Sequence, residues 1–212
     1  MTESKHADYQ KFFQKDDYAD IHVTLTLESP AVVIPMHQII ICTTSAYFKE
    51  ACQIANIGQT GAKLLDFCMS VEAFNIISAW VYGFGEKSFK SESDICVIQD
   101  VLGCLKRFEM NEYDEMDELR AALLKHLFQL HLNTLTSEED AYGFEQQFDV
   151  LKDTCDFALP RDHNLIKDLV VANIPDIRAS GKWLNGFLFK GGSSLVASVL
   201  IEVYEQLLDS RT

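Results

Sequence analysis

The chain has 212 residues and a formal net charge of −14, with 48% hydrophobic and 24% charged residues. This length and composition are typical of a globular protein that buries enough apolar surface to fold without disulfide or metal crosslinks. The excess of carboxylates, without a cluster of Lys and Arg, argues against nucleic acid or an anionic membrane surface as a partner.

Charged side chains interrupt residues 1–19, and no stretch approaches the roughly 20 apolar residues of a membrane-spanning helix. We therefore expect no secretory signal and a cytoplasmic or nuclear location. The cysteines form no Cys-x-x-Cys pair and are expected to be reduced, buried side chains. They are Cys42, Cys52, Cys68, Cys96, Cys104 and Cys155.

The N-terminal segment, residues 1–18, is polar apart from Tyr9, Phe12 and Phe13. Two adjacent exposed phenylalanines would be unusual in a monomer. The pair either covers the core of its own domain or packs against a partner subunit; the second interpretation is what the family resemblance described below implies, and both stay open here.

Residues 20–48 predict a β-hairpin followed by two helices. Four apolar residues alternate with polar ones, which is the pattern of a strand with one buried face: Ile21, Val23, Leu25 and Leu27. Residues 28–30 supply a turn, and residues 31–34 supply a second β-branched run. After Pro35 the apolar spacing becomes three to four, which is helical, and Ser45 is expected to cap a second helix.

The residues of this segment also resemble a known family. They come in the order Asp20-Ile21, Met36-His37, Ile40-Ile41 and Ser45-Ala46-Tyr47-Phe48. This order is similar to the opening hairpin and helix pair of the BTB/POZ domain. The resemblance extends to about Leu130 and implies a BTB/POZ domain over residues 19–131, acting as a protein-interaction module without chemistry of its own.

Further elements follow at helical or strand spacing. Residues 52–62 predict a loop, Lys63–Phe67 a third strand, and Ser70 the cap of a helix that closes at Tyr82-Gly83. Residues 85–89 predict a turn or a residual edge strand. Ser91 or Ser93 is expected to cap a helix that reaches Met110, and a further helix, with the acidic run 112–118 at its start, ends near His131.

Residues 132–212 predict an all-helical C-terminal extension. Helices are expected over 138–159, 165–177 and 195–208, with an apolar segment at 183–189. The predicted fold class is therefore α+β, with a small mixed sheet covered by helices and then the helical extension. In outline the chain resembles the short BTB proteins with a helical tail that are abundant in fungi.

For function, the resemblance implies self-association, as a homodimer or with another BTB protein, and a role as a scaffold or adaptor. The residues expected at the dimer interface are Phe12, Phe13, Tyr18, Asp20, Ile40, Tyr47 and Lys49. An enzyme is not expected, because no nucleophile–base spacing or phosphate-binding loop occurs. We therefore expect no cofactor and no small-molecule substrate. No metal site is expected, because His126 and His131 are five residues apart and fall on different helix faces.

The alternative function is a substrate adaptor of a cullin-RING ubiquitin ligase. Such adaptors commonly carry a hydrophobic-x-Glu motif after the second helix, and Ile54-Ala55-Asn56 stands at that place. Ile54, Asn56 and Tyr82 are the residues expected to face a cullin. Because Asn56 lacks the carboxylate that makes charge-assisted hydrogen bonds, docking is expected to be weak.

A separate expectation concerns the hydrogen-bond partner of Asp20. In many BTB domains the aspartate at this place faces a cationic residue directly after the histidine, but here that residue is Gln38. Asp20 must therefore find another hydrogen-bond donor or stay partly solvated.

Overall fold

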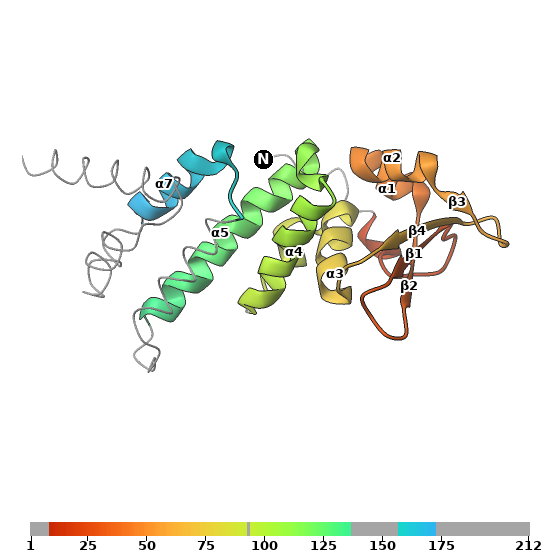
Figure 1. Cartoon of the computed structure of the whole chain (residues 1–212), viewed down its shortest axis with the longest axis horizontal. Coiled ribbons are helices and arrows are strands. Elements are labelled where there is room, and N and C mark those ends of the chain that lie inside the picture. Colours follow the sequence, from red (N-terminus) through yellow and green to blue (C-terminus); the bar gives the residue numbers. More distant parts are fainter. Residues whose placement is uncertain (1–8, 93, 137–156, 173–212) are drawn as a thin grey trace, which may run out of the picture. The chain divides into compact units, whose positions relative to one another are not determined.

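The computed structural model describes residues 9–92, 94–136 and 157–172 (Figure 1). The chain divides into two compact units, Met1–Ala122 and Leu123–Thr212. Both this division and the predicted boundary after residue 131 fall inside the same helix, α5 (Asp114–Thr136). Helices and a mixed sheet are both present, as the α+β prediction requires.

The first unit contains a four-stranded mixed sheet with the order β2-β1-β4-β3. Its strands are β1 (Ile21–Leu25), β2 (Val32–Met36), β3 (Asn56–Ile57) and β4 (Lys63–Phe67). β1 pairs antiparallel with β2 and parallel with β4, whereas β3 pairs antiparallel with β4. The predicted hairpin and third strand are confirmed. The loop predicted over residues 52–62 is wrong at its start, because α2 and β3 occupy it.

The strand limits differ from the prediction for a physical reason in each case. β2 continues through Pro35, which an edge strand tolerates because the missing N–H faces away from the sheet. In β1, Ile21, Val23 and Leu25 are buried as predicted. Leu27 lies beyond the last paired residue of β1 and is 57% exposed, so its predicted burial is wrong.

Two short helices, α1 (Gln38–Thr44) and α2 (Ala46–Ile54), connect β2 to the rest of the sheet and pack against each other. Ser45 lies between them, and its Oγ accepts a hydrogen bond from the Phe48 N–H at 3.3 Å. This is the predicted cap, which satisfies one of the free amides in the first turn of α2.

The third helix, α3 (Val71–Ala79), begins as predicted, because Ser70 Oγ accepts from the Ala73 N–H at 3.1 Å. It continues as the π-helical segment η2 (Trp80–Phe84), in which Gly83 has a φ of 85°. Such a left-handed conformation suits glycine. Residues 85–88 then form the 3-10 helix η3 (Gly85–Ser88), so the edge strand considered there is wrong.

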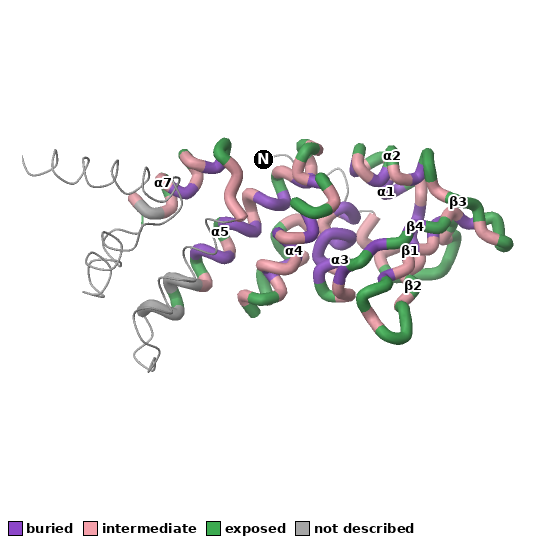
Figure 2. The backbone as a smooth tube through the Cα atoms, viewed as in Figure 1, coloured by how far each residue is buried: buried purple, intermediate pink, exposed green. Residues whose placement is uncertain are grey.

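Helix α4 (Ile95–Arg107) lies beside α3 (Figure 1). Its cap is Asp94, whose Oδ1 accepts from the Cys96 N–H at 2.8 Å, so the cap predicted at Ser91 is wrong, and Ser93 lies outside the described residues. A short 3-10 turn, η4 (Met110–Glu112), leads from α4 to α5. Figure 2 shows buried residues along β1, α3 and α4, whereas the β1–β2 and β3–β4 connections are exposed.

Helix α5 has the predicted apolar stripe, in which four side chains are buried: Met116, Leu119, Leu123 and Leu127. It runs past the predicted end near His131 to Thr136. Acidic residues occupy the first turn of α5, where the helix dipole favours them.

Within the second unit the structure describes the 3-10 helix η5 (Pro160–Asp162) and α7 (His163–Ala172). Residues 157–159 are not helical, so the helix predicted to reach Leu159 is wrong at its end, and residues 137–156 lie outside the described residues. The next predicted helix begins two residues earlier than expected, at His163. Residues 173–177 and the elements predicted over 183–189 and 195–208 also lie outside the described residues.

The described cysteines have different environments. Cys52 and Cys104 are buried as predicted, Cys42 is half-buried, and Cys68 and Cys96 are exposed, so the prediction of burial is wrong for the last two. Cys155 lies outside the described residues. Of the helices in the described part of the chain, none has the length and apolar character that crossing a membrane requires.

Candidate protein-interaction surfaces

Asp20 joins the start of β1 to the start of α1. Its Oδ1 accepts a hydrogen bond from the Gln38 N–H at 2.6 Å, so the alternative donor that the sequence required is the backbone of Gln38 itself. The Asp20 main chain pairs with Met36 at 3.1 Å and with Lys63 at 3.0 Å. The first N–H groups of a helix lack acceptors within the helix, and the Asp20 carboxylate supplies an acceptor for the first N–H of α1. Its carboxylate is exposed and has a structural role.

His37 and Tyr82 form a buried hydrogen-bonded pair. The His37 N–H donates to Tyr82 Oη at 3.0 Å, and His37 Nδ1 lies 2.9 Å from the same oxygen. His37 Nε2 lies 2.8 Å from the Asp17 carbonyl oxygen. If the Tyr82 hydroxyl donates to Nδ1, the Nε2–H donates to Asp17, and all these groups are satisfied by a neutral imidazole.

Tyr82 is therefore not a surface residue. It is only 1% exposed, and burial raises the pKa of its hydroxyl to about 12. The prediction that Tyr82 faces a cullin is wrong, because both its ring and its hydroxyl are occupied inside the domain. The sequence pattern marked Tyr82 as the end of a helix, and the structure places it inside η2 with its side chain buried.

Phe12 and Phe13 pack on their own domain, at the end of the short 3-10 helix η1 (Gln10–Phe12). The Phe12 ring lies 5.5 Å from the ring of His37, and the Phe13 ring lies 5.5 Å from that of Tyr82. Gln10 Nε2 donates to the Gly83 carbonyl at 2.8 Å. These contacts support the first interpretation of the phenylalanine pair, in which it covers the core.

Two other apolar side chains, in the segments next to Asp20 and Gln38, face solvent. Ile40, expected at the dimer interface, is 3% exposed and belongs to the core, so that expectation is wrong. Its neighbour Ile39 is 80% exposed, and Tyr18 is 89% exposed. The bond between Asp20 and Gln38 holds the two segments together, because Asp20 follows Tyr18 by two residues and Gln38 precedes Ile39. We call Tyr18 and Ile39 the Tyr18–Ile39 surface.

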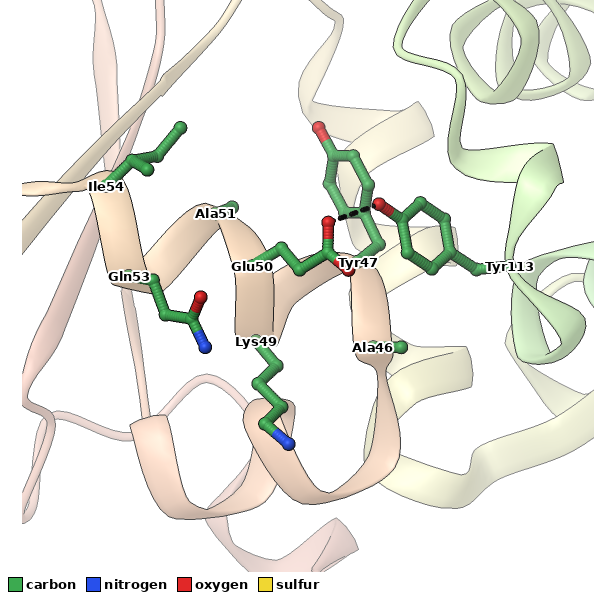
Figure 3. A pocket seen from close by; sticks show the side chains of 8 residues that line it. All are labelled: Ala46, Tyr47, Lys49, Glu50, Ala51, Gln53, Ile54 and Tyr113. Atoms are coloured by element: carbon green, nitrogen blue, oxygen red, sulfur yellow. Dashed lines mark hydrogen bonds between the residues drawn. The ribbon is translucent and has the colours of Figure 1, made fainter.

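A second candidate surface is a concavity on α2 with a volume of about 590 Å³ (Figure 3). We call it the α2 concavity. It is lined by Ala46, Tyr47, Lys49, Glu50, Ala51, Gln53, Ile54 and Tyr113. Tyr47 and Lys49, predicted for the dimer interface, thus share this concavity with Ile54, predicted to face a cullin.

Tyr113 closes one end of the α2 concavity. Its hydroxyl donates to Glu50 Oε2 at 2.8 Å, and its ring lies edge-on to the Tyr47 ring with a centroid distance of 5.6 Å. The hydrogen bond to Glu50 and the nearby carboxylates raise the pKa of the Tyr113 hydroxyl. Burial, with a smaller effect of Tyr113, raises the pKa of Tyr47 to about 12. Sequence reasoning did not single out Tyr113 or Glu50, because they are 63 residues apart in the chain.

Ile54 marks the other end of α2. It is 86% exposed, and Asn56 beside it is exposed, as a contact with a partner would require. Ile57 is also exposed, which the sequence did not predict because residues 52–62 carried only loop signals. Lys63 Nζ donates to the Cys52 carbonyl at 2.7 Å and so satisfies one of the last carbonyls of α2.

The buried thiols give little support for nucleophilic chemistry. Burial raises the pKa of Cys52 to about 12 and that of Cys104 to about 11, which keeps both sulfurs protonated. Among residues 9–92, 94–136 and 157–172, no three His, Cys, Asp or Glu side chains are grouped so that they could hold a metal ion.

Neither a model of a known protein family nor a curated protein matches this sequence.

Proposed function

We propose that this protein is an interaction module of the BTB/POZ type that self-associates, as a homodimer or with another BTB chain, and acts as a scaffold or adaptor. The observation that carries the proposal is the exposure of two large apolar side chains in the segments that the Asp20–Gln38 hydrogen bond joins: Tyr18 is 89% exposed and Ile39 is 80% exposed. Exposed apolar side chains that gather on one surface are typical of contact sites, because their removal from water favours association.

The backbone at Tyr18 supports this interpretation. Tyr18 has a φ of 65°, in the left-handed region that bulky residues rarely adopt. A strained residue of this kind persists when its surroundings hold it, and such residues concentrate at functional sites. Here the strain presents an aromatic ring to solvent and not to the core. The order of elements, a hairpin, a helix pair and a third strand, also agrees with the family that the sequence resembles.

Light scattering across the micromolar range tests the proposal. We expect a mass of twice the 24.0 kDa of one chain. Ile39→Asp should shift the protein to the monomer, because it places a carboxylate in the apolar contact. The matched control is Leu27→Asp, since Leu27 is an exposed leucine outside the Tyr18–Ile39 surface. A mass of one chain for the unmodified protein would overturn the proposal.

One observation favours the cullin adaptor as a second candidate. Ile54 projects from the end of α2 and is 86% exposed, as an anchor that inserts into a partner must be. Calorimetry with the N-terminal domain of the third cullin tests this function. Submicromolar affinity that Ile54→Asp abolishes and Leu27→Asp preserves would make the adaptor the leading function. We expect weak or absent binding, because Asn56 replaces the glutamate.

A further inference from the structure

The aromatic end of the α2 concavity combines two rings with a carboxylate that has acceptor capacity to spare. Glu50 is exposed, and its Oε2 accepts from the Tyr113 hydroxyl at 2.8 Å. A carboxylate can accept about four hydrogen bonds. Figure 3 shows the Glu50 carboxylate beside the rings of Tyr47 and Tyr113, with Ile54 at the opposite end of α2.

The charges around this end are mainly negative. Glu112 and Glu115 lie close enough to Tyr113 to raise the pKa of its hydroxyl, together with Glu50. Lys49 is the cationic residue among those that line the concavity, and its ammonium group points away from the two rings (Figure 3). A positive charge placed beside Glu50 and the two rings would therefore meet favourable potential from several carboxylates.

We propose that this end of the α2 concavity binds an arginine side chain from a partner protein, while Ile54 contacts an apolar residue of the same partner segment. A guanidinium group stacks on aromatic faces and can donate two parallel hydrogen bonds to a carboxylate, so arginine fits better than lysine. The inference rests on the proposed interaction function and names the chemistry of the partner.

The spacing of the two contacts sets the partner motif. Glu50 and Ile54 are four residues apart on α2, which is about 6 Å along the helix axis. In an extended segment, residues i and i+2 are about 7 Å apart. An arginine two residues from a leucine therefore matches both ends of the concavity.

The probe is the peptide acetyl-Arg-Ala-Leu-amide, titrated into the ¹⁵N-labelled full chain and followed by amide chemical shifts. Its control is the same peptide with citrulline, which has the shape of arginine without its charge. We expect saturable shifts along residues 46–54 and at Tyr113, with millimolar affinity, and an affinity about 5- to 10-fold lower for the citrulline peptide, since charge-assisted hydrogen bonds are roughly twice as strong as neutral ones.

The protein variants test the role of each charge. Glu50→Gln keeps an acceptor for Tyr113 but removes the charge, and we expect about 5-fold weaker binding of the arginine peptide. Glu72→Gln, an exposed carboxylate at the start of α3, is the matched control and should leave the affinity unchanged. Lys49→Gln should not weaken binding. The spectra also report whether each variant is folded.

Three results would overturn the inference: equal affinity for the two peptides, unchanged affinity in Glu50→Gln, or shifts confined to residues outside the concavity. The result is independent of self-association. A monomer that binds the arginine peptide at the α2 concavity removes only the self-association, whereas a dimer that does not bind it removes only the arginine site.

Discussion

At the scale of single residues, Asp20 shows how one exposed carboxylate can be structural. It accepts from the Gln38 N–H at 2.6 Å and so serves the start of α1, where His37 provides no side-chain cap. The donor is a backbone amide, which is present whatever side chain stands at position 38. This donor could not be identified from the side chains in the sequence, since it belongs to the main chain.

Replacement of Asp20 should therefore have a graded effect. Asp20→Ala should lower the free energy of unfolding by about 0.5–1 kcal/mol, at the low end for a helix-capping residue because the carboxylate is exposed. Asp20→Asn keeps an acceptor oxygen and should cost less. Urea denaturation of both variants measures this. A loss of several kcal/mol in Asp20→Asn would reveal a charge partner that the hydrogen bonds do not show.

Removal of the Tyr82 hydroxyl is expected to lower the free energy of unfolding. Tyr82→Phe leaves the His37 N–H and Nδ1 without a partner in a buried site, at a cost of about 1–3 kcal/mol. Tyr113→Phe is the matched control, because its hydroxyl bonds Glu50 at the surface, and it should leave stability nearly unchanged. Equal melting of the two variants in urea would contradict the buried hydrogen bonds.

The raised pKa of the Tyr82 hydroxyl predicts how the stability of the protein depends on pH. Burial raises the pKa of Tyr82 from 10.0 to about 12, so the folded protein holds this proton more tightly than the unfolded chain. The resulting stability is complete below pH 10 and is lost as the pH rises from 10 to about 12. Urea midpoints should fall across this range, and Tyr82→Phe should show a shallower fall. Tyr47, with a pKa of about 12, supplies part of the remaining slope.

Side-chain direction was the least predictable property at this scale. Periodicity located the helix over residues 38–44, but Ile39, Ile40 and Ile41 are alike in the sequence. Only the packing of α1 decides that Ile40 and Ile41 point to the core and Ile39 to solvent. For this reason Ile40 and Tyr82, which the sequence predicted to face a partner, are both buried, whereas Ile39 is exposed.

At the scale of elements, the start of a helix was predicted correctly where the sequence offered a single candidate for its capping residue. Ser45 and Ser70 each accept a hydrogen bond from an N–H in the first turn of the following helix, as predicted. Before α4 several polar residues compete, and the geometry selects Asp94. β3 could not be foreseen, because two residues carry no periodicity and pair only because β4 lies next to them.

The choice of cap before α4 gives a direct test. Asp94→Ala should lower the free energy of unfolding by about 1 kcal/mol, because it removes the acceptor for the Cys96 N–H and a negative charge at the positive end of the helix. Ser91→Ala should have almost no effect, since Ser91 is exposed and does not cap α4. Thermal melts of the two variants compare them, and a larger loss in Ser91→Ala would contradict the assigned cap.

At the scale of the whole molecule, the charge of −14 sets the conditions under which the proposed contacts form. Two copies of this chain repel each other, and the repulsion reaches about 30 Å at 0.01 M salt but only about 8 Å at physiological salt. The Tyr18–Ile39 surface is apolar, so its attraction does not depend on screening. An arginine at the α2 concavity, in contrast, is attracted by charge.

The two proposed contacts should therefore respond to salt in opposite directions. We expect self-association, measured by light scattering, to strengthen as salt rises from 0.01 M to 0.15 M, because screening removes repulsion between the copies. Over the same range the arginine peptide should bind the α2 concavity more weakly, because screening removes attraction to Glu50 and its neighbours. A dimer that dissociates as salt increases would show that ion pairs, and not the exposed Tyr18 and Ile39, hold the two chains together.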